Sequence, residues 1–187
     1  MIRSGDWLNS SILVISDSHG DIPAFIAVLE WAKGLNIDEA VFLGDGVDDI
    51  APAAARTGFN RSWHTVRGNG DYQFSIPDNT VLTLPSGRKL FLTHGHRYNV
   101  REGYKSLAVI ARNAGAEAAL FGHTHIPYCG TTEGVFLLNP GSISRPRSNA
   151  GYTFAVMECP DSGPCSANFF IIATQSGKII IRQLELK

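Results

Sequence analysis

Six short segments of the sequence place acidic, amide or imidazole side chains directly after an apolar run. They are Asp17-Ser18-His19, Gly44-Asp45, Gly68-Asn69-Gly70-Asp71, His94-Gly95-His96, Gly122-His123-Thr124-His125 and Asn139-Pro140-Gly141-Ser142. Carboxylate, amide and imidazole groups without thiolate form mixed oxygen and nitrogen sites, which suit Mn²⁺, Fe, Co²⁺, Ni²⁺ or Zn²⁺. A structural zinc site would usually draw on cysteine. The residue types therefore predict a site for transition-metal chemistry.

Each segment has a simpler interpretation when it is taken alone. Gly-Asp after a strand is more often a turn than a ligand, Asp-x-His can combine a helix cap with a surface imidazole, and Asn-Pro-Gly-Ser is a turn signal. The conjunction argues against these interpretations, because five of the six histidines lie in the six segments. The exception is His64, in the middle of a predicted strand, where a packed imidazole is expected.

The donors are more numerous than one transition metal takes from a protein while leaving room for substrate. Two metal ions that share one carboxylate account for the number. Two such ions about 3.5–4 Å apart can hold a hydroxide between them and bind the oxygens of an in-line phosphoryl displacement. The donor set therefore predicts a site of this dinuclear kind.

These segments need a sheet that brings the ends of its strands together. Apolar runs at residues 11–16, 40–43 and 63–66 predict three buried strands. A helix that Asp21 caps and Gly34 stops is expected after the first strand, and a second helix at about 49–56. Such a β-α-β-α-β series builds a sheet covered by helices, and ligands bind beyond the carboxyl ends of its strands.

The rest of the chain predicts a second sheet and one more helix. Strands are expected at residues 81–84, 89–93, 118–121, 152–157, 168–173 and 178–186, with another pair on either side of Gly134. The helix is expected at about 102–114, before Gly115. We find no linker, so the sequence predicts one domain over residues 1–187, with two sheets packed together and helices outside.

Composition limits the function. The chain has 187 residues and a formal net charge of −1, which argues against general nucleic-acid binding because no basic excess faces a phosphate backbone. Three cysteines predict a reducing compartment, with a bridge between Cys159 and Cys165 as the less favoured alternative. No apolar stretch resembles a signal peptide or a membrane span. A cytoplasmic protein away from membranes is expected, and a homo-oligomer stays open.

In their order, the motifs resemble those of the calcineurin-like metallophosphoesterase superfamily. The resemblance runs from Asp17 to about Arg147 and is closest to the small single-domain bacterial and archaeal phosphodiesterases, whose last motif is similar to Asn139-Pro140-Gly141-Ser142 followed by Pro146-Arg147. It implies an α/β fold, a four-layer α/β/β/α sandwich of two mixed sheets with flanking helices. It also implies a phosphodiesterase that acts on a small phosphate ester with two divalent ions, Mn²⁺ before Ni²⁺, Fe, Co²⁺ or Zn²⁺.

The resemblance also assigns roles to residues of this chain. It implies one metal ion on Asp17, His19 and His125, a second on Asn69, His94 and His123, and Asp45 as the bridge between them. A hydroxide held by both ions would attack phosphorus, while Asn69 and His96 stabilise the charge on the phosphoryl oxygens. Asp45, Asn69 and His96 are thus the expected catalytic residues. Asn69, His96 and Arg147 are expected to contact the substrate.

Two positions leave alternatives open. Many members of the superfamily carry, after the Asn of the third motif, a His that is proposed to protonate the leaving group, and here the residue is Gly70. His96 is the candidate replacement, as an acid or as a phosphate contact. Asp48 completes the Gly-Asp-x-x-Asp pattern, and it either orients neighbouring ligands or is an acid at a helix N-terminus.

The main alternative function is a non-catalytic protein-interaction scaffold on the same fold. The retromer subunit that resembles these enzymes has an impaired metal site, whereas all the expected ligands are present here. A DNA nuclease of the superfamily is disfavoured by the length and charge of the chain. A protein phosphatase resembling calcineurin is disfavoured by size and by Gly70.

Overall fold

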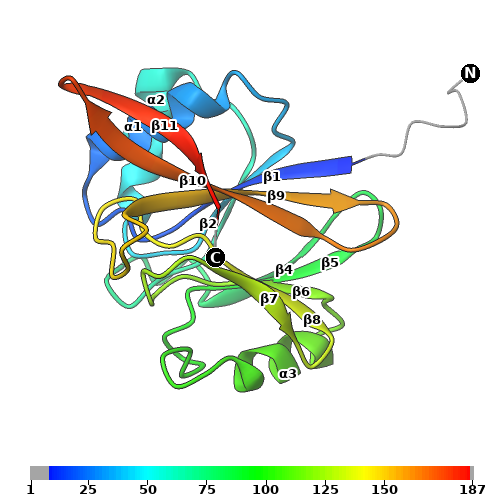
Figure 1. Cartoon of the computed structure of the whole chain (residues 1–187). Coiled ribbons are helices and arrows are strands. Elements are labelled where there is room, and N and C mark those ends of the chain that lie inside the picture. The colour runs from blue at the N-terminus through cyan, green and yellow to red at the C-terminus, as the bar shows by residue number, and fades with distance from the viewer. Residues whose placement is uncertain (1–8, 186–187) are drawn as a thin grey trace, which may run out of the picture.

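The first of two β-sheets combines strands from both ends of the chain (Figure 1). The computed structural model describes residues 9–185. In this sheet the strand order is β11-β10-β9-β1-β2-β3, with bounds β1 Asn9–Ile15, β2 Glu39–Phe42, β3 Trp63–Thr65, β9 Tyr152–Pro160, β10 Ser166–Gln175 and β11 Lys178–Leu184. β1, β2 and β3 are parallel, and the others are antiparallel to their neighbours, so the sheet is mixed.

The second sheet has the order β4-β5-β6-β8-β7. Its strands are β4 Asn79–Thr83, β5 Lys89–Thr93, β6 Ala118–Leu120, β7 Tyr128–Thr132 and β8 Val135–Asn139. β5, β6 and β8 are parallel, while β4 and β7 pair antiparallel at the two edges. This sheet is therefore mixed as well.

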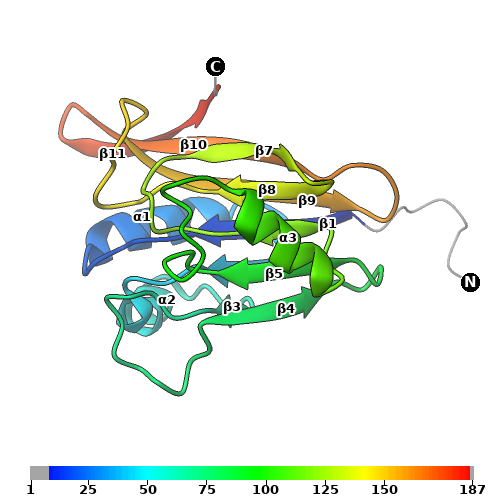
Figure 2. The same ribbon diagram turned by 90° about the horizontal axis from the view of Figure 1, so that it is seen from below.

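Helices cover the outer faces of the two sheets (Figures 1 and 2). The helices α1 (Ile22–Ala32) and α2 (Ile50–Thr57) pack on the first sheet, and α3 (Lys105–Asn113) packs on the second. A short 3₁₀ turn, Val47–Asp49, precedes α2. Because the sheets pack against each other between these helices, the predicted four-layer α/β/β/α sandwich is confirmed.

The sequence of β1 is apolar from Ile12 to Ile15 and does not alternate there between apolar and polar residues. Ile12 and Val14 face the second sheet, and Leu13 and Ile15 face the helices, so all four side chains are fully buried. Successive side chains of a strand point to opposite faces, and a strand covered on both faces is hydrophobic throughout. This burial also holds the carboxyl end of β1 in place, next to the segment Asp17-Ser18-His19 that follows it.

The element boundaries differ from expectation at a few points. α3 begins at Lys105 rather than near residue 102, because Gly103 has a φ of 146° and keeps the preceding segment in a loop. β9 and β10 extend beyond the expected ranges, since they pair as one long hairpin from Tyr152 to Ile172. Both differences lie away from the strand ends that carry the six segments.

The cysteine thiols are free in the structure. Cys159 and Cys165 are buried and face each other across the β9–β10 hairpin with 2.7 Å between their Sγ atoms, while Cys129 is exposed. Within residues 9–185 no helix has the length and apolar character to cross a membrane. The cytoplasmic location stays a prediction from the sequence.

Candidate metal centre

Each of the six segments follows or ends one of the six parallel strands. The segments with Asp17, Asp45 and Asn69 come after β1, β2 and β3 of the first sheet. Those with His94 and His123 come after β5 and β6 of the second sheet, and Asn139 ends β8. The carboxyl ends of the two sets meet at one edge of the sandwich, so segments far apart in the sequence build a single site.

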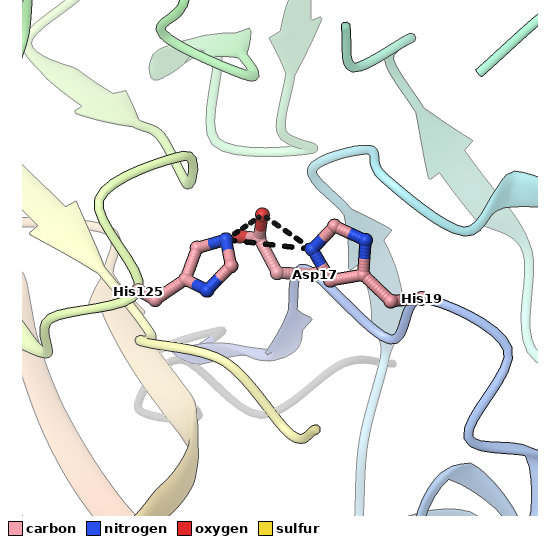
Figure 3. Close-up of side chains that lie close together, drawn as sticks. All are labelled: Asp17, His19 and His125. Carbon is pink, nitrogen blue, oxygen red and sulfur yellow. Dashed lines mark hydrogen bonds and ion pairs between the residues drawn. The ribbon is translucent and has the colours of Figure 1, made fainter. Parts of the chain in front are cut away.

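One group of possible ligands consists of Asp17, His19 and His125 (Figure 3). The Nε2 atom of His125 lies 3.0 Å from Asp17 Oδ1, and that of His19 lies 3.8 Å from the same oxygen. The two Nε2 atoms are 3.4 Å apart. Asp17 is fully buried, and His125 is 4% exposed. This is the set that the sequence assigned to the first ion.

A second group of possible ligands consists of Asp45, His94 and, again, Asp17. Asp45 Oδ2 lies 3.8 Å from His19 Nε2 and 3.6 Å from His94 Nε2. His94 Nε2 is also 3.9 Å from Asp17 Oδ1. Asp45 therefore lies between a ligand assigned to the first ion and one assigned to the second, and Asp17, which belongs to both groups, does so as well.

The polar atoms at the middle of this cluster fit cations. Asp17 Oδ1 and His94 Nε2 are buried, and neither makes a hydrogen bond of acceptable geometry within the described part of the chain. A buried polar atom without a partner is costly. Imidazole nitrogens and carboxylate oxygens that converge in this way are the mixed donors that divalent transition metals take.

The remaining candidate ligands and contacts surround this cluster. Asn69 and His123 line a cavity of about 340 Å³ beside the cluster. The ring of His123 lies 5.2 Å from that of His94, and the ring of His96 lies 5.4 Å from it, between centroids. Arg147 lines the same cavity as Asn69. The structure thus brings all the predicted site residues to one place, whereas His64 lies apart and pairs with Glu39 at 2.9 Å.

The backbone at the centre is strained. Positive φ angles from 44° to 66° occur at five of the predicted ligands, namely Asp17, His19, Asp45, His123 and His125. Residues other than glycine rarely occupy this region, and such strain collects at functional sites. At these strand ends the backbone therefore adopts a locally unfavourable conformation in order to place the side chains of the predicted ligands.

Hydrogen bonds to backbone carbonyls orient two of the imidazoles. His94 Nδ1 lies 2.7 Å from the carbonyl oxygen of Leu43, and His125 Nδ1 lies 2.5 Å from that of Arg145. A ring that donates from Nδ1 to a carbonyl leaves the Nε2 lone pair free for a ligand role. The Nε2 atoms are the ones that face Asp17.

Asp17 is held by both sheets. Its Oδ2 accepts hydrogen bonds from Ser16 Oγ at 2.5 Å and from the backbone N–H of His123 at 3.1 Å. Its carbonyl oxygen accepts from the hydroxyls of Ser142 and Ser144 at 2.7 and 2.9 Å. The turn after β8 therefore supports the first ligand, which gives the Asn-Pro-Gly-Ser segment a role beyond turning the chain.

Asp71 is a positioning residue that the sequence did not single out. Its Oδ2 accepts from the N–H groups of Asp45 and Gly68 at 2.7 and 2.8 Å, and its Oδ1 accepts from Gly46 and Val47 at 2.8 and 3.0 Å. This buried carboxylate thereby ties the loop after β2 to the loop after β3. Its place two residues beyond Asn69 was the only signal in the sequence.

Asp49 is the second residue of this kind. Its Oδ2 accepts from Ser18 Oγ at 2.6 Å and from the N–H of Gly20 at 2.8 Å, so it fixes the segment that carries His19. Asp48, for which the sequence left open an orienting role or a place at a helix N-terminus, is exposed within the 3₁₀ turn and accepts a hydrogen bond from Gln73. The orienting contacts at this turn come from Asp49.

Burial favours the neutral form of three imidazoles, those of His19, His96 and His123. Desolvation, followed by the charges of His94 and Arg101, lowers the pKa of His123 to about 4. Desolvation also lowers the pKa values of His19 and His96. A neutral imidazole is the form that binds a metal. His123 and His19 are therefore ready as ligands near neutral pH without losing a proton.

The pair of His125 and Asp17 behaves differently. Burial opposes the charged form of each, but the 3.0 Å approach of His125 Nε2 to Asp17 Oδ1 and their mutual attraction outweigh it. The pKa of His125 is raised and the pKa of Asp17 is lowered. An ion pair of this kind, in the protein without metal, holds the two ligands together.

A mixed two-sheet fold whose strand ends gather carboxylate and imidazole groups defines a class of metal-binding α/β proteins. Comparison with known proteins gives the particular family. Residues 11–162 match the calcineurin-like phosphoesterase superfamily domain, and the chain belongs to that superfamily. The chain is 29% identical over 166 residues to the phosphodiesterase YfcE of Escherichia coli, across 79% of this chain and 86% of the relative. This family is metal-dependent and places the chain among phosphoesterases.

Solved structures agree with the fold. A conserved protein from Streptococcus pneumoniae, described as a predicted phosphoesterase, superposes with a TM-score of 0.74 at 28% identity, over 95% of this chain and 99% of that chain. A Vps29 variant from Entamoeba histolytica superposes with a TM-score of 0.72 at 22% identity, over 95% and 99% of the two chains. The second likeness concerns the fold alone.

Proposed function

We propose that the chain is a phosphodiesterase that hydrolyses a small phosphate ester with two divalent transition-metal ions, Mn²⁺ preferred. The observation that carries the proposal is the convergence of three imidazole Nε2 atoms within 3.9 Å of the buried Asp17 Oδ1. The phosphodiesterase named among the relatives supports the preference for diesters.

The chain offers ligands for both ions. One ion would be held by Asp17, His19 and His125, the other by Asn69, His94 and His123, and Asp45 would contact both. Bound there, the two cations would lower the pKa of a water between them and offset the charge of the phosphoryl group. The orienting contacts from Asp71 and Asp49 would keep the ligand loops in register.

Side chains of the cavity then act on the substrate. The exposed amide of Asn69 would donate a hydrogen bond to a phosphoryl oxygen, which stabilises charge that builds there. His96 has a lowered pKa and a buried Nδ1 that makes no hydrogen bond within residues 9–185. A neutral imidazole suits a hydrogen bond to the phosphate better than proton donation. With glycine at position 70, esters whose leaving group needs little protonation should react best.

Hydrolysis of two aryl esters tests the proposal. With Mn²⁺ or Ni²⁺, the protein should cleave bis(p-nitrophenyl) phosphate, and Asp45→Asn should lower kcat by about a thousandfold or more while losing bound metal. His96→Ala should retain its metal content and lose turnover to a similar extent for good and poor leaving groups, whereas a loss that falls mainly on poor leaving groups would identify His96 as a proton donor. Efficient cleavage of p-nitrophenyl phosphate with no cleavage of the diester would contradict the proposal.

A protein-interaction scaffold is the second candidate, because the fold is shared with Vps29. The retained donor set favours the enzyme, since a scaffold has no need for buried imidazole nitrogens without a hydrogen bond, such as His94 Nε2. The two candidates separate in one experiment. Metal-loaded protein that cleaves none of a panel of phosphomonoesters, diesters and cyclic nucleotides would favour the scaffold.

A further inference from the structure

The cavity beside the candidate metal centre is lined by three arginines. Arg101, Arg145 and Arg147 face a space of about 340 Å³, together with residues of the metal cluster. The one carboxylate in its lining is Asp45, which the proposed function assigns to the metal ions. Beyond the cluster itself, the charged lining of this cavity is entirely positive.

The three guanidinium groups have no carboxylate partner. None of them forms an ion pair within residues 9–185, whereas Arg67 and Arg97 nearby share Asp78 at 2.6 and 2.9 Å. Unpaired cations that line a cavity attract anions, and a guanidinium matches the geometry of phosphate oxygens through paired N–H donors. The arrangement suits a phosphate group better than a single carboxylate.

The backbone that carries two of these arginines is fixed on a predicted ligand. The carbonyl oxygen of Arg145 lies 2.5 Å from His125 Nδ1, and the N–H of Arg147 donates to the carbonyl oxygen of His125 at 3.2 Å. The N–H of Arg145 also donates to Ser142 Oγ at 2.8 Å. The fold thereby fixes the backbone of Arg145 and Arg147 beside the metal cluster.

Arg101 comes from a different loop, between β5 and α3. Its neighbour Val100 is 2% exposed and packs in the core beneath α3. A turn closed by the N–H of Glu102 on the carbonyl oxygen of Asn99, at 2.8 Å, holds the loop. Arg101 also lines a smaller adjoining cavity with His96 and His123. It therefore adds a third guanidinium group to the lining of the larger cavity, from a second loop.

The other side of the metal cluster has the opposite charge. A cavity of about 230 Å³ there is lined by Asp48, Asp49 and Asp71, with Tyr72 and Gln73, and no arginine or lysine lines it. A second anionic group of a substrate would be repelled from this side. Charge alone thus sets which way such a substrate lies across the centre.

We propose that Arg101, Arg145 and Arg147 bind a second phosphate group, so that the substrates are phosphodiesters that carry a phosphate besides the scissile one. The proposal rests on the proposed function for its scissile bond. It adds a substrate class, and it assigns binding roles to Arg101 and Arg145.

A matched pair of esters tests this. Thymidine 5′-(p-nitrophenyl phosphate) and its 3′-phosphorylated form have the same scissile bond and leaving group and differ by one phosphate. We expect kcat/KM to be at least about tenfold higher for the 3′-phosphorylated ester. Arg101→Gln, Arg145→Gln and Arg147→Gln should each lower this ratio about threefold or more, and the triple variant should bring it near one.

Arg56→Gln is the control, because Arg56 is an exposed arginine of α2 that lines neither cavity. It should leave the ratio as in the parent. A parent ratio near one, or a ratio that the triple variant preserves, overturns the proposal.

Binding of inorganic pyrophosphate to the metal-stripped protein separates this inference from the proposed function. Calorimetry should detect binding in the parent and in Arg56→Gln, and none in the triple variant, whose folding circular dichroism can verify. If neither ester is cleaved, the proposed function fails, and this measurement still decides the site. Absence of binding in the parent, or binding that persists in the triple variant, would overturn the inference.

Discussion

Asp71 illustrates how one buried carboxylate can hold two loops. Four backbone N–H groups donate to its two oxygens, and two of those groups belong to Asp45 and its neighbour Gly46. The ligand role proposed for Asp45 therefore depends on a residue that would touch neither metal nor substrate. A change at Asp71 should act on stability and activity together.

Replacement of Asp71 by Asn tests this. The amide keeps one acceptor oxygen and puts an NH₂ group against the other pair of N–H donors, so we expect the free energy of unfolding to fall by about 2–4 kcal/mol. Activity should fall as well, because the loop that carries Asp45 loses its anchor. Urea unfolding of the metal-stripped protein and an ester assay give the two readouts.

Asp48→Asn is the matched control. Asp48 is exposed, and its one hydrogen bond in the described part of the chain comes from Gln73. Its substitution should change the free energy of unfolding by no more than about 0.5 kcal/mol. Equal effects of the two substitutions would contradict the positioning role inferred for Asp71.

The imidazole of His123 predicts a pH dependence. Burial, with the charges of His94 and Arg101, lowers its pKa to about 4, whereas the unfolded value is about 6.5. Between these values the unfolded chain binds a proton that the folded chain does not. This contribution to stability is therefore complete above about pH 6.5 and is lost as the pH falls toward about 4.

Metal-stripped parent and His123→Gln should differ in this window. From about pH 7 to about pH 5, the parent should lose more of its free energy of unfolding than the variant, because the variant has no group that titrates at this position. Unfolding by urea at the two pH values measures both losses. Equal losses would mean that His123 is protonated in the folded protein.

Among the elements, β1 and β6 come from different sheets and meet at the metal centre. Gly122, after β6, makes this approach possible, because a Cβ atom there would lie 2.0 Å from Ser16 Oγ and 2.7 Å from Asp17 Oδ2. Both atoms belong to the segment after β1. The contact between the two sheets at this edge thus requires glycine.

Gly122→Ala should therefore displace Asp17. We expect it to cost at least about 2 kcal/mol of unfolding free energy and to reduce bound Mn²⁺. Gly34→Ala is the control, since its Cβ would meet its nearest atom, the carbonyl oxygen of Trp31, at 3.4 Å. That substitution should be neutral or stabilise by up to about 1 kcal/mol. Chemical denaturation and elemental analysis decide, and normal metal content in Gly122→Ala would contradict the expectation.

The elements and the chemical segments differ in how far the sequence predicts them. Central strands such as β1, β2, β5 and β6 were predictable because they are mostly buried and their sequences are apolar runs. The start of α3 was not, because Gly103 and the anchoring of Val100 depend on tertiary packing. The roles of Asp71 and Arg101 were not predicted for the same reason. They arise only where loops from different strands come together, and no local sequence pattern indicates which loops do so.

At the scale of the whole molecule, the proposed ligands come from both sheets. Asp17, His19, Asp45 and Asn69 follow strands of the first sheet, and His94, His123 and His125 follow strands of the second. Apolar packing holds the layers together elsewhere. At this edge carboxylate and imidazole groups from both sheets lie close together, so bound cations would connect the two halves of the sandwich.

Metal binding should consequently stabilise the entire fold. A ligand that binds only the folded state at about a hundred times its Kd adds about 2.7 kcal/mol, so Mn²⁺ should raise the Tm of the metal-stripped protein. Asp45→Asn should lose most of this rise. Asp38→Asn should retain it, because Asp38 precedes β2 at the opposite end from Asp45 and bonds to the N–H of Ser11. Thermal unfolding across a Mn²⁺ titration measures all three proteins, and an equal rise in Asp45→Asn would show that this carboxylate does not join the metals to both sheets.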